Sequence, residues 1–173
     1  IGFQSDSCTV DRYDSMRRFC KGVKLCKAGS AISELFAVKT DAEIAAMRRA
    51  ARAGDDALKK FIQKLKAGIT ERGAADMLED LCRKQGSEKP SFPTIVLFGA
   101  RAALPHGSPS NRKLRKGDWV LCDFGCTCNG LCSDMSRTFV MGAASPKQKH
   151  VYNVVLRRSE ELRVGKECAT GCR

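Results

Sequence analysis

Hydrophobic and polar positions between residues 40 and 86 repeat with the period of helices. Thr40 and Glu43 fit the capping box that begins a helix, and helical spacing continues to Gly68, which ends it. Thr70 caps a second helix, which Gly86 closes. We expect the core faces of this helix pair to consist of Ile44, Met47, Ala51, Leu58, Phe61, Ile62 and Leu65, followed by Ala74, Met77, Leu78 and Leu81.

The pattern changes after the helix pair to one typical of strands. Pro90, Pro93 and Gly99 bracket a predicted strand, Thr94–Phe98. A loop rich in Pro, Ser, Gly and Lys then covers Arg101–Gly117 and leads into the next strand.

The strongest strand signal is a hairpin over Trp119–Gly142. Two apolar, β-rich runs flank Asn129 and Gly130, the dipeptide most typical of a two-residue turn. Beyond the hairpin, Ser145 and Pro146 begin a last helix. We expect the core face of this helix to be Val151, Val154 and Val155, with His150 on its polar side.

Two aspartates interrupt the apolar strands of this hairpin. In the register that the turn implies, Asp123 lies opposite Ser136 and Asp134 lies opposite Gly125, so the carboxylates are diagonal neighbours on one face. Carboxylates this close repel each other, and an unpaired charge on a half-buried face is costly. A divalent cation bound by oxygen ligands removes both costs. The alternative is a structural pair, one aspartate hydrogen-bonded to a turn and the other salt-bridged to Arg137 or another base.

The loop before the hairpin carries one of the two histidines of the chain, His106. Pro105 and Gly107 flank it, and rigid backbone on both sides is one way to hold a side chain over a site. The residues by themselves favour the alternative, a solvated loop histidine.

The first 40 residues mix short elements. Ile1–Phe3 fits the end of a strand, Thr9 caps a helix that runs through Phe19, Val23–Leu25 is a short strand candidate, and Ser30–Val38 is another short helix. We interpret this region as the last unit of an α/β domain whose beginning is missing.

Charge and hydropathy limit the classes of partner. The 31 Lys and Arg exceed the 19 Asp and Glu, which gives a net charge of +12 and suggests a nucleic-acid ligand. The basic residues are scattered, however, and no aromatic residues are interleaved with them, so we expect no nucleic-acid partner. No apolar run is long enough to span a membrane, so we expect no membrane partner either. The densest basic cluster lies on the solvated face of the first long helix and beyond it: Arg48, Arg49, Arg52, Lys59, Lys60, Lys64 and Lys66.

Ten cysteines are a high count, and four of them crowd the hairpin. Strand parity places Cys122, Cys126 and Cys128 on the face opposite Asp123, whereas Cys132 shares the face of the aspartates. Zinc ligands must converge, and these do not. A disulfide framework is typical of small secreted proteins, so we expect reduced, mostly buried thiols and a cytoplasmic protein.

Five motifs in fixed order are together distinctive: P-S-F-x-T-I-V at 90–96, L-P-H-G at 104–107, K-G-D at 116–118, D-F-G at 123–125 and C-S-D-M-S-R-T-F at 132–139. This set resembles the catalytic domain of the Xaa-Pro peptidases, aminopeptidase P and prolidase, which are metallopeptidases with the pita-bread fold. The resemblance runs from Lys39 to Leu156.

The resemblance implies an α+β protein with the N-terminal half of the pita-bread (creatinase/aminopeptidase) fold, preceded by the tail of an α/β domain. Residues 1–38 would be the remnant of the N-terminal domain and residues 39–157 the first half of the catalytic domain. Residues 158–173 closely resemble the conceptual translation of a sequencing-adapter oligonucleotide, so we expect a non-native tail there. The alternative is an ordinary polar helix extension that ends at Gly165.

The resemblance also implies a two-metal site with five protein ligands: two Asp, one His and two Glu. Asp123 matches the ligand that chelates one ion and Asp134 the ligand that bridges both, whereas His106 matches a histidine that contacts substrate. The implied cofactors are two divalent ions, Mn²⁺ first, with Co²⁺ or Zn²⁺ as alternatives. The family's histidine and glutamate ligands come from later strands, which this chain does not reach.

The function implied is that of a metal-dependent exopeptidase that hydrolyses Xaa-Pro bonds of proline-containing peptides through a dinuclear metal-bound hydroxide. With two of five ligands, the chain itself is expected to be an inactive fragment of a homodimeric parent. The alternatives are a methionine aminopeptidase-like hydrolase, which shares the fold and both aspartates, and a non-catalytic pita-bread binding module. Retention of Asp123 and Asp134 argues against the metal-free creatinase branch and against the binding module.

Overall fold

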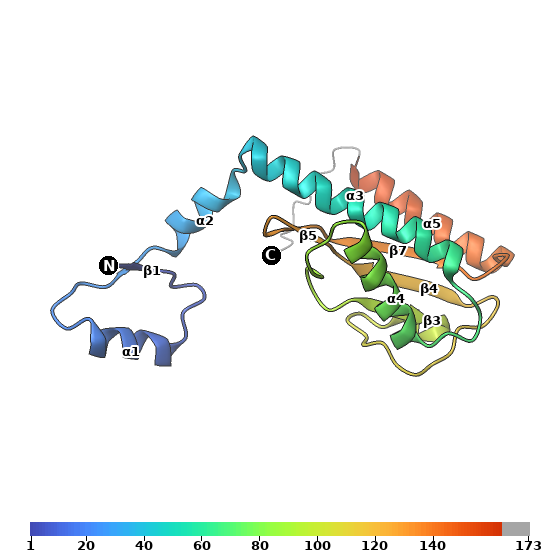
Figure 1. Ribbon diagram of the computed structural model, residues 1–173, viewed down its shortest axis with the longest axis horizontal. Coiled ribbons are helices and arrows are strands. Elements are labelled where there is room, and N and C mark those ends of the chain that lie inside the picture. The colour runs from blue at the N-terminus through green and yellow to red at the C-terminus, as the bar shows by residue number, and fades with distance from the viewer. Residues whose placement is uncertain (164–173) are drawn as a thin grey trace. The chain divides into compact units, whose positions relative to one another are not determined.

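The computed structural model describes residues 1–163. Its chain divides into two compact units, Ile1–Ala45 and a second that begins at Ala46 (Figure 1). The boundaries expected from the resemblance, after residues 38 and 157, stay predictions. The last helix continues through Arg163, and the rest of the expected non-native tail lies outside the described residues.

The first unit is built from short elements: β1 (Gly2–Phe3), α1 (Val10–Phe19), β2 (Cys26–Lys27) and α2 (Gly29–Ala37). Thr9 caps α1 as expected, since its side chain accepts a hydrogen bond from the backbone N–H of Arg12 at 3.3 Å. No residue of α1 is buried. This unit therefore has secondary structure with very little core.

The strand predicted at Val23–Leu25 is wrong. The strand is β2, which pairs in parallel with β1. The backbone N–H groups of Cys26 and Ala28 donate to Ile1 O and Phe3 O, both at 2.9 Å. A two-residue strand exists only where its partner places hydrogen-bonding groups, and the partner here lies more than 20 residues away in the sequence.

The predicted helix pair is confirmed as α3 (Asp41–Lys64) and α4 (Glu71–Lys84). The capping box is reciprocal: the N–H of Thr40 donates to Glu43 Oε2 at 2.7 Å, and the N–H of Glu43 donates to Thr40 Oγ1 at 3.3 Å. At the start of α4, Thr70 Oγ1 accepts from the N–H of Gly73 at 3.1 Å. Local capping chemistry thus sets where both helices begin.

The buried face of α3 differs in part from the expected one. Phe61 is fully buried as predicted, but Ile44, Met47 and Ile62 are 37–46% exposed. The helix instead packs through small residues, and a Cβ at Gly54 would lie 3.3 Å from Met135 Cε. Small residues allow close approach to the sheet, which a search for large apolar residues overlooks. The buried stripe consists of Ala46, Ala50, Ala53, Gly54, Ala57, Leu58 and Phe61.

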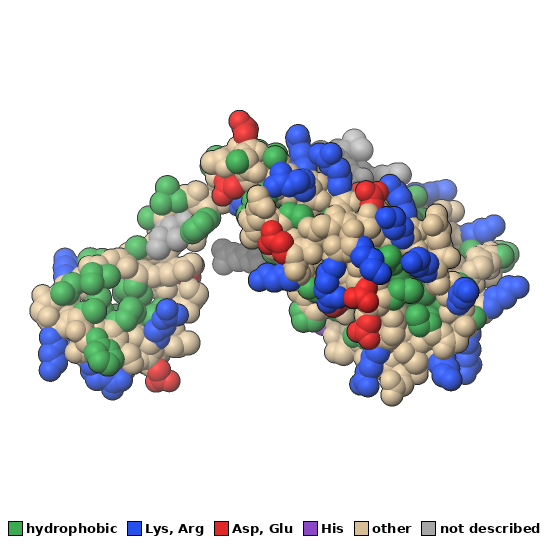
Figure 2. Space-filling view, in the orientation of Figure 1, with side chains coloured by type: hydrophobic (Ala, Val, Ile, Leu, Met, Phe, Trp, Pro, Cys, Tyr) green, Lys and Arg blue, Asp and Glu red, His purple; other side chains and the backbone are tan. Residues whose placement is uncertain are grey.

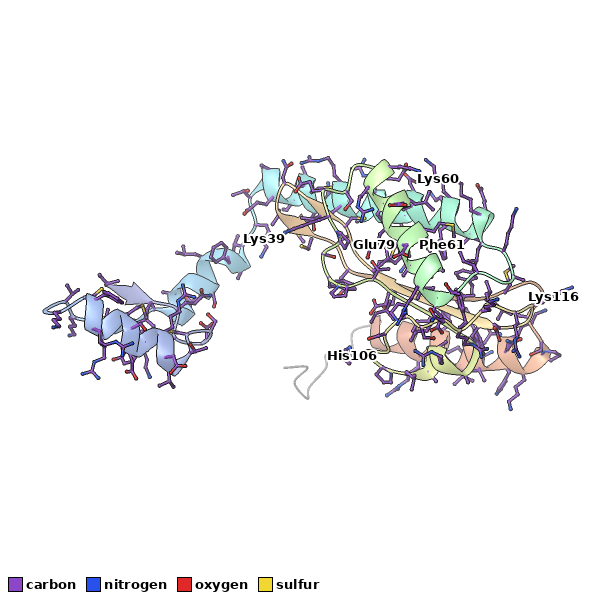
Figure 3. The ribbon with its side chains drawn as sticks, turned by 60° about the horizontal axis from the view of Figure 1, so that its bottom comes forward. Lys39, Lys60, Phe61, Glu79, His106 and Lys116 are labelled. Atoms are coloured by element: carbon purple, nitrogen blue, oxygen red, sulfur yellow. The ribbon has the colours of Figure 1, made fainter. Side chains whose placement is uncertain are left out.

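The main sheet has three antiparallel strands in the order β3 (Ile95–Phe98), β4 (Trp119–Phe124) and β7 (Met135–Val140). A 3₁₀ turn, η1 (Gly99–Ala103), follows β3. Figure 3 shows the strands between α3 and α4 on one face and α5 (Pro146–Arg163) on the other. Burial alternates along β4, which indicates one closed face and one half-open face.

The predicted hairpin turn and its register are confirmed. Asn129 and Gly130 have φ values of 50° and 74°, as a type I′ turn needs, and join β5 (Thr127–Cys128) to β6 (Leu131–Cys132). Asp123 pairs with Ser136, as expected. The ladder is interrupted between β4 and β5, where a Cβ on Gly125 would lie 2.0 Å from the carbonyl oxygen of Ser133. Only glycine lets the backbone pass there.

The predicted core face of the last helix is wrong. Val151, Val154 and Val155 are 46%, 53% and 65% exposed. The half-open face of the sheet leaves a groove of about 640 Å³ beside α5, lined in part by Val151, Val155 and Trp119. Helical period locates an apolar stripe, but the surface available to cover it depends on tertiary packing. His150 is exposed, as expected.

Lysine and arginine side chains are spread over the face of the second unit that Figure 2 shows. Arg48, Arg49 and Arg52 on α3 are exposed, and Lys59 pairs with Asp56 at 3.0 Å. The basic cluster of α3 is therefore a solvated helix face, as predicted. Among residues 1–163, no helix combines the length and the apolarity that crossing a bilayer requires.

Candidate metal centre

The three residues singled out from the motifs, His106, Asp123 and Asp134, line a single cavity of about 530 Å³. Figure 3 shows His106 on the α5 side of the sheet, away from Phe61 and Glu79, which lie among the helices of the other face. The other lining residues come from the segment before and within β3, from the loop after His106 and from β7: Phe92, Pro93, Thr94, Ile95, Gly107, Ser108, Pro109 and Ser136.

Asp123 lies on β4 and is half-buried. Its neighbours in the sequence, Cys122 and Phe124, are buried on the α3 and α4 side, so strand alternation places the carboxylate on the open side. Ser136 Oγ donates to Asp123 Oδ1 at 2.8 Å across the strand pair. The remaining oxygen lone pairs of this carboxylate are available to the cavity.

Asp134 is exposed and lies between β6 and β7. The structural alternative expected a base beside one aspartate, with Arg137 as the nearest candidate. Arg137 instead lies 3.8 Å from Asp55 and donates to the carbonyl oxygen of Ser136. Among the side chains of the described part of the chain, neither Asp123 nor Asp134 has an ion-pair partner. Two carboxylates that share a cavity without a basic partner favour a cation there.

His106 occupies the left-handed region of backbone space, with φ of 54°. Within residues 1–163, Asn129 is the only other residue besides glycine with positive φ. Such strain concentrates at functional positions. Gly107 brings the loop against β3, since a Cβ there would lie 2.8 Å from Leu97 Cδ1. The exposed imidazole thus lies at the cavity on a residue with left-handed backbone, and the next residue packs closely against β3.

One residue near the site, Glu71, did not stand out in the sequence. Its side chain is fully buried in the first turn of α4 and accepts hydrogen bonds from the N–H of Phe98, from Arg101 and from Ser110. Burial by itself would raise the pKa of Glu71, but the hydrogen bonds from Ser110, Phe98 and Arg101 together lower the pKa below its ordinary value. Its position next to the capping Thr70 concealed it, because an acidic residue in a first helical turn is common.

The hairpin cysteines follow the expected parity. Cys122, Cys126 and Cys128 are buried on the α3 and α4 side, whereas Cys132 is exposed. Burial raises the pKa of the Cys122 thiol to about 12, which keeps it protonated and unreactive. The three buried thiols form part of the core and not of the candidate site.

The donor set fits a hard divalent cation. The cavity offers carboxylate oxygens from Asp123 and Asp134, and no lysine or arginine is among the described residues that line it. Within residues 1–163, no three His, Cys, Asp or Glu side chains lie close enough together to hold a metal ion, although His106, Asp123 and Asp134 line the same cavity. The two aspartates therefore fit as part of a metal site that needs further ligands.

Comparison with known proteins finds a matching peptidase family. The sequence model described as Metallopeptidase family M24 matches residues 45–169. An uncharacterised peptidase of Bacillus subtilis is 36% identical over 155 residues, which are 90% of this chain and 44% of that protein. The Xaa-Pro dipeptidase of Pyrococcus furiosus is 38% identical over 130 residues, which are 75% of this chain and 37% of that protein.

Solved structures show the same likeness. The Xaa-Pro dipeptidase from Bacillus anthracis superimposes with a TM-score of 0.84 at 35% identity, covering 90% of this chain and 44% of that one. The X-Pro aminopeptidase from Thermotoga maritima gives a TM-score of 0.84 at 30% identity, covering 92% of this chain and 46% of that one. The predicted α+β pita-bread fold is confirmed over the part that the chain spans, which is less than half the length of these relatives. The chain belongs to metallopeptidase family M24.

Proposed function

We propose that this chain supplies part of the active site of an exopeptidase that hydrolyses Xaa-Pro peptide bonds. The observation that carries the proposal is the convergence of His106, Asp123 and Asp134 on one cavity, although they come from a loop and two strand ends. Relatives named as Xaa-Pro dipeptidase and X-Pro aminopeptidase support this substrate class over the N-terminal methionine of the alternative.

Asp123 and Asp134 would hold two divalent ions, for which Mn²⁺ is the first candidate. When bound, such ions lower the pKa of water and polarise a carbonyl oxygen. Ser136 orients Asp123 through its 2.8 Å hydrogen bond, so the carboxylate needs little reorganisation to accept a cation.

His106 would contact the substrate from the loop side of the cavity, where its imidazole can donate a proton to or accept one from a polar group of the peptide. Phe92, Pro93 and Ile95 line the same cavity and would exclude water from an apolar substrate residue. The cavity thus combines acidic, imidazole and apolar groups in the manner expected of a peptidase subsite.

The described residues provide two of the five ligands that the resemblance implies. We propose that the histidine and the two glutamates belong to a longer parent protein, which acts as a homodimer in the cytoplasm. The downstream coding sequence should then encode a Gly-His segment and two later glutamates. The chain by itself should bind Mn²⁺ weakly and should not hydrolyse peptides.

Titration of the chain with Mn²⁺ in a thermal-shift experiment tests the site. Binding stabilises the folded state, by about 2.7 kcal/mol when the ion is at a hundred times its Kd. Asp123→Asn and Asp134→Asn should each abolish the stabilisation, whereas Asp76→Asn, which removes an exposed carboxylate from α4, should keep it. Equal stabilisation of all four proteins would contradict the proposed site.

Incubation of the chain with Mn²⁺ and an Xaa-Pro dipeptide such as Ala-Pro tests the second part. We expect no release of free proline. Clear turnover that Asp134→Asn abolishes would overturn the proposal that the chain lacks essential ligands.

A further inference from the structure

We propose that Glu71 positions His106 in the cavity, through hydrogen bonds that connect the start of α4 to both ends of the His106 loop. This inference rests on the proposed function, because His106 gains a role only at a working site. Glu71 itself does not line the cavity, so it would act through the loop and not by contact with substrate.

The Glu71 side chain contacts the residues that lead into the His106 loop. Glu71 Oε1 accepts from the N–H of Phe98 at 2.9 Å, which ties it to the end of β3. The Nε of Arg101 lies 3.2 Å from Glu71 Oε1 and 3.0 Å from Oε2, so one guanidinium contacts both oxygens. A fully buried carboxylate with this many donors is held in one orientation.

The Glu71 side chain also contacts the residues that lead out of the His106 loop. Ser110 donates to Glu71 Oε2 through its N–H at 2.9 Å and through its Oγ at 2.6 Å. The Nη2 atom of Arg101 also donates a hydrogen bond to the carbonyl oxygen of Ser108 at 2.7 Å. Glu71 and its partner Arg101 therefore close the loop across the residues that precede and follow His106.

The closed loop supports the backbone conformation of His106. Residues 106–109 line the cavity, and the left-handed backbone at His106 costs energy that surrounding contacts must offset. Backbone contacts between α4 and the loop contribute too, since the N–H of Glu71 donates to Arg112 O at 3.0 Å and the N–H of Arg72 to Ser110 O at 3.2 Å. The Glu71 side chain is the one group that contacts β3, Arg101 and Ser110 together among the described contacts.

The experiment uses the whole chain and observes the two histidine rings by NMR. His150 is exposed on α5 and serves as the internal reference. In Glu71→Gln, the amide keeps the shape but loses the charge, and its NH₂ group opposes one of the donors. We expect the His106 ring signals to move to the positions of a free histidine, while the signals of His150 and of the core methyl groups stay unchanged.

A matched control and a milder variant sharpen the test. Glu79→Gln removes a carboxylate from the same helix that pairs with Arg83 and does not touch the loop, so His106 should keep its signals. Ser110→Ala removes the hydroxyl donor alone and should shift His106 in the same direction as Glu71→Gln, by less. If Glu71→Gln does not fold, Ser110→Ala decides the question.

Addition of Mn²⁺ provides a measurement that Glu71→Gln would not change if Glu71 only stabilised the fold. Paramagnetic broadening falls steeply with distance, so the ion should broaden His106 in the unchanged chain and lose that effect in Glu71→Gln. Absence of broadening in the unchanged chain would contradict the proposed metal site alone, because the shifts without metal still test Glu71. Unchanged His106 signals in folded Glu71→Gln or Ser110→Ala would overturn the positioning role.

Discussion

The two faces of the sheet differ in what their side chains meet. Val120, Cys122 and Phe124 point from β4 toward α3 and α4 and are at most 1% exposed. Leu121 and Asp123 lie between them in the sequence and are only partly buried on the α5 side. One strand therefore contributes alternate residues to a closed core and to an open cavity. Residues that stabilise the core therefore alternate along β4 with residues on the side of the candidate site.

This separation explains why the site tolerates charge. On the closed face a carboxylate would need a partner, and the one that is buried beside that face, Glu71, has four donor groups around it. On the open face Asp123 and Asp134 keep access to the cavity, and no lysine or arginine is among the described residues that line it. The half-open face is therefore where carboxylates without an ion-pair partner can remain accessible to a ligand.

The largest effect is expected on the closed face. Phe124→Ala removes a side chain that is 1% exposed in the main core, and large-to-small changes of this kind cost about 3–5 kcal/mol. Urea unfolding should show a loss in this range. Asp123→Asn, at the neighbouring position, should change stability by less than about 0.5 kcal/mol while it abolishes Mn²⁺ binding. Similar stability losses in the two variants would contradict the comparison.

The contribution of Glu71 to stability should depend on pH. Its pKa is lower in the folded chain than the ordinary 4.5, so its stabilisation is complete above that pH and is lost as the pH falls through the folded pKa. Glu71→Gln should cost about 2 kcal/mol at neutral pH, since hydrogen bonds to charged groups contribute about 1.5–3 kcal/mol.

Urea unfolding of the two proteins at a series of pH values checks this sign. The difference in unfolding free energy should shrink as the pH is lowered below 4.5. A difference that grows in acid would show that the carboxylate is not held in its ionised form.

A substitution in the hairpin turn should have a moderate effect on stability. Asn129 has φ of 50°, and most residues other than Asn, Asp and Gly pay about 1–2 kcal/mol for a left-handed conformation. Asn129→Val should therefore destabilise the hairpin by about this amount in thermal unfolding. Asn129→Gly is the control and should remain close to the unchanged chain, because glycine adopts this backbone freely.

The smallest effect is expected on α5. Val154 is 53% exposed, so Val154→Ser should change the free energy of unfolding by no more than about 0.5 kcal/mol. A loss of several kcal/mol in chemical denaturation would mean that this face of α5 is covered in solution.

Local chemistry made much of the fold predictable from the sequence. The capping residues Thr40 and Thr70 set the starts of α3 and α4, and Asn129 with Gly130 set the turn. Because a two-residue turn sets the register of the strands that it joins, that turn also predicted that Asp123 pairs with Ser136. The two aspartates could thus be placed on one face before their cavity was seen, whereas His106 was singled out only by the family resemblance.

Only the tertiary structure decided which surfaces are covered and which distant groups meet. It buried the small residues of α3 around Gly54 and left Val155 exposed on α5, because burial depends on what packs opposite a stripe and not on its period. It also joined Glu71 to Ser110, 39 positions later, into one hydrogen-bonded loop support. Caps, turns and strand parity act within a few residues, so sequence determines them, whereas contacts across the chain exist only once the fold has brought their partners together.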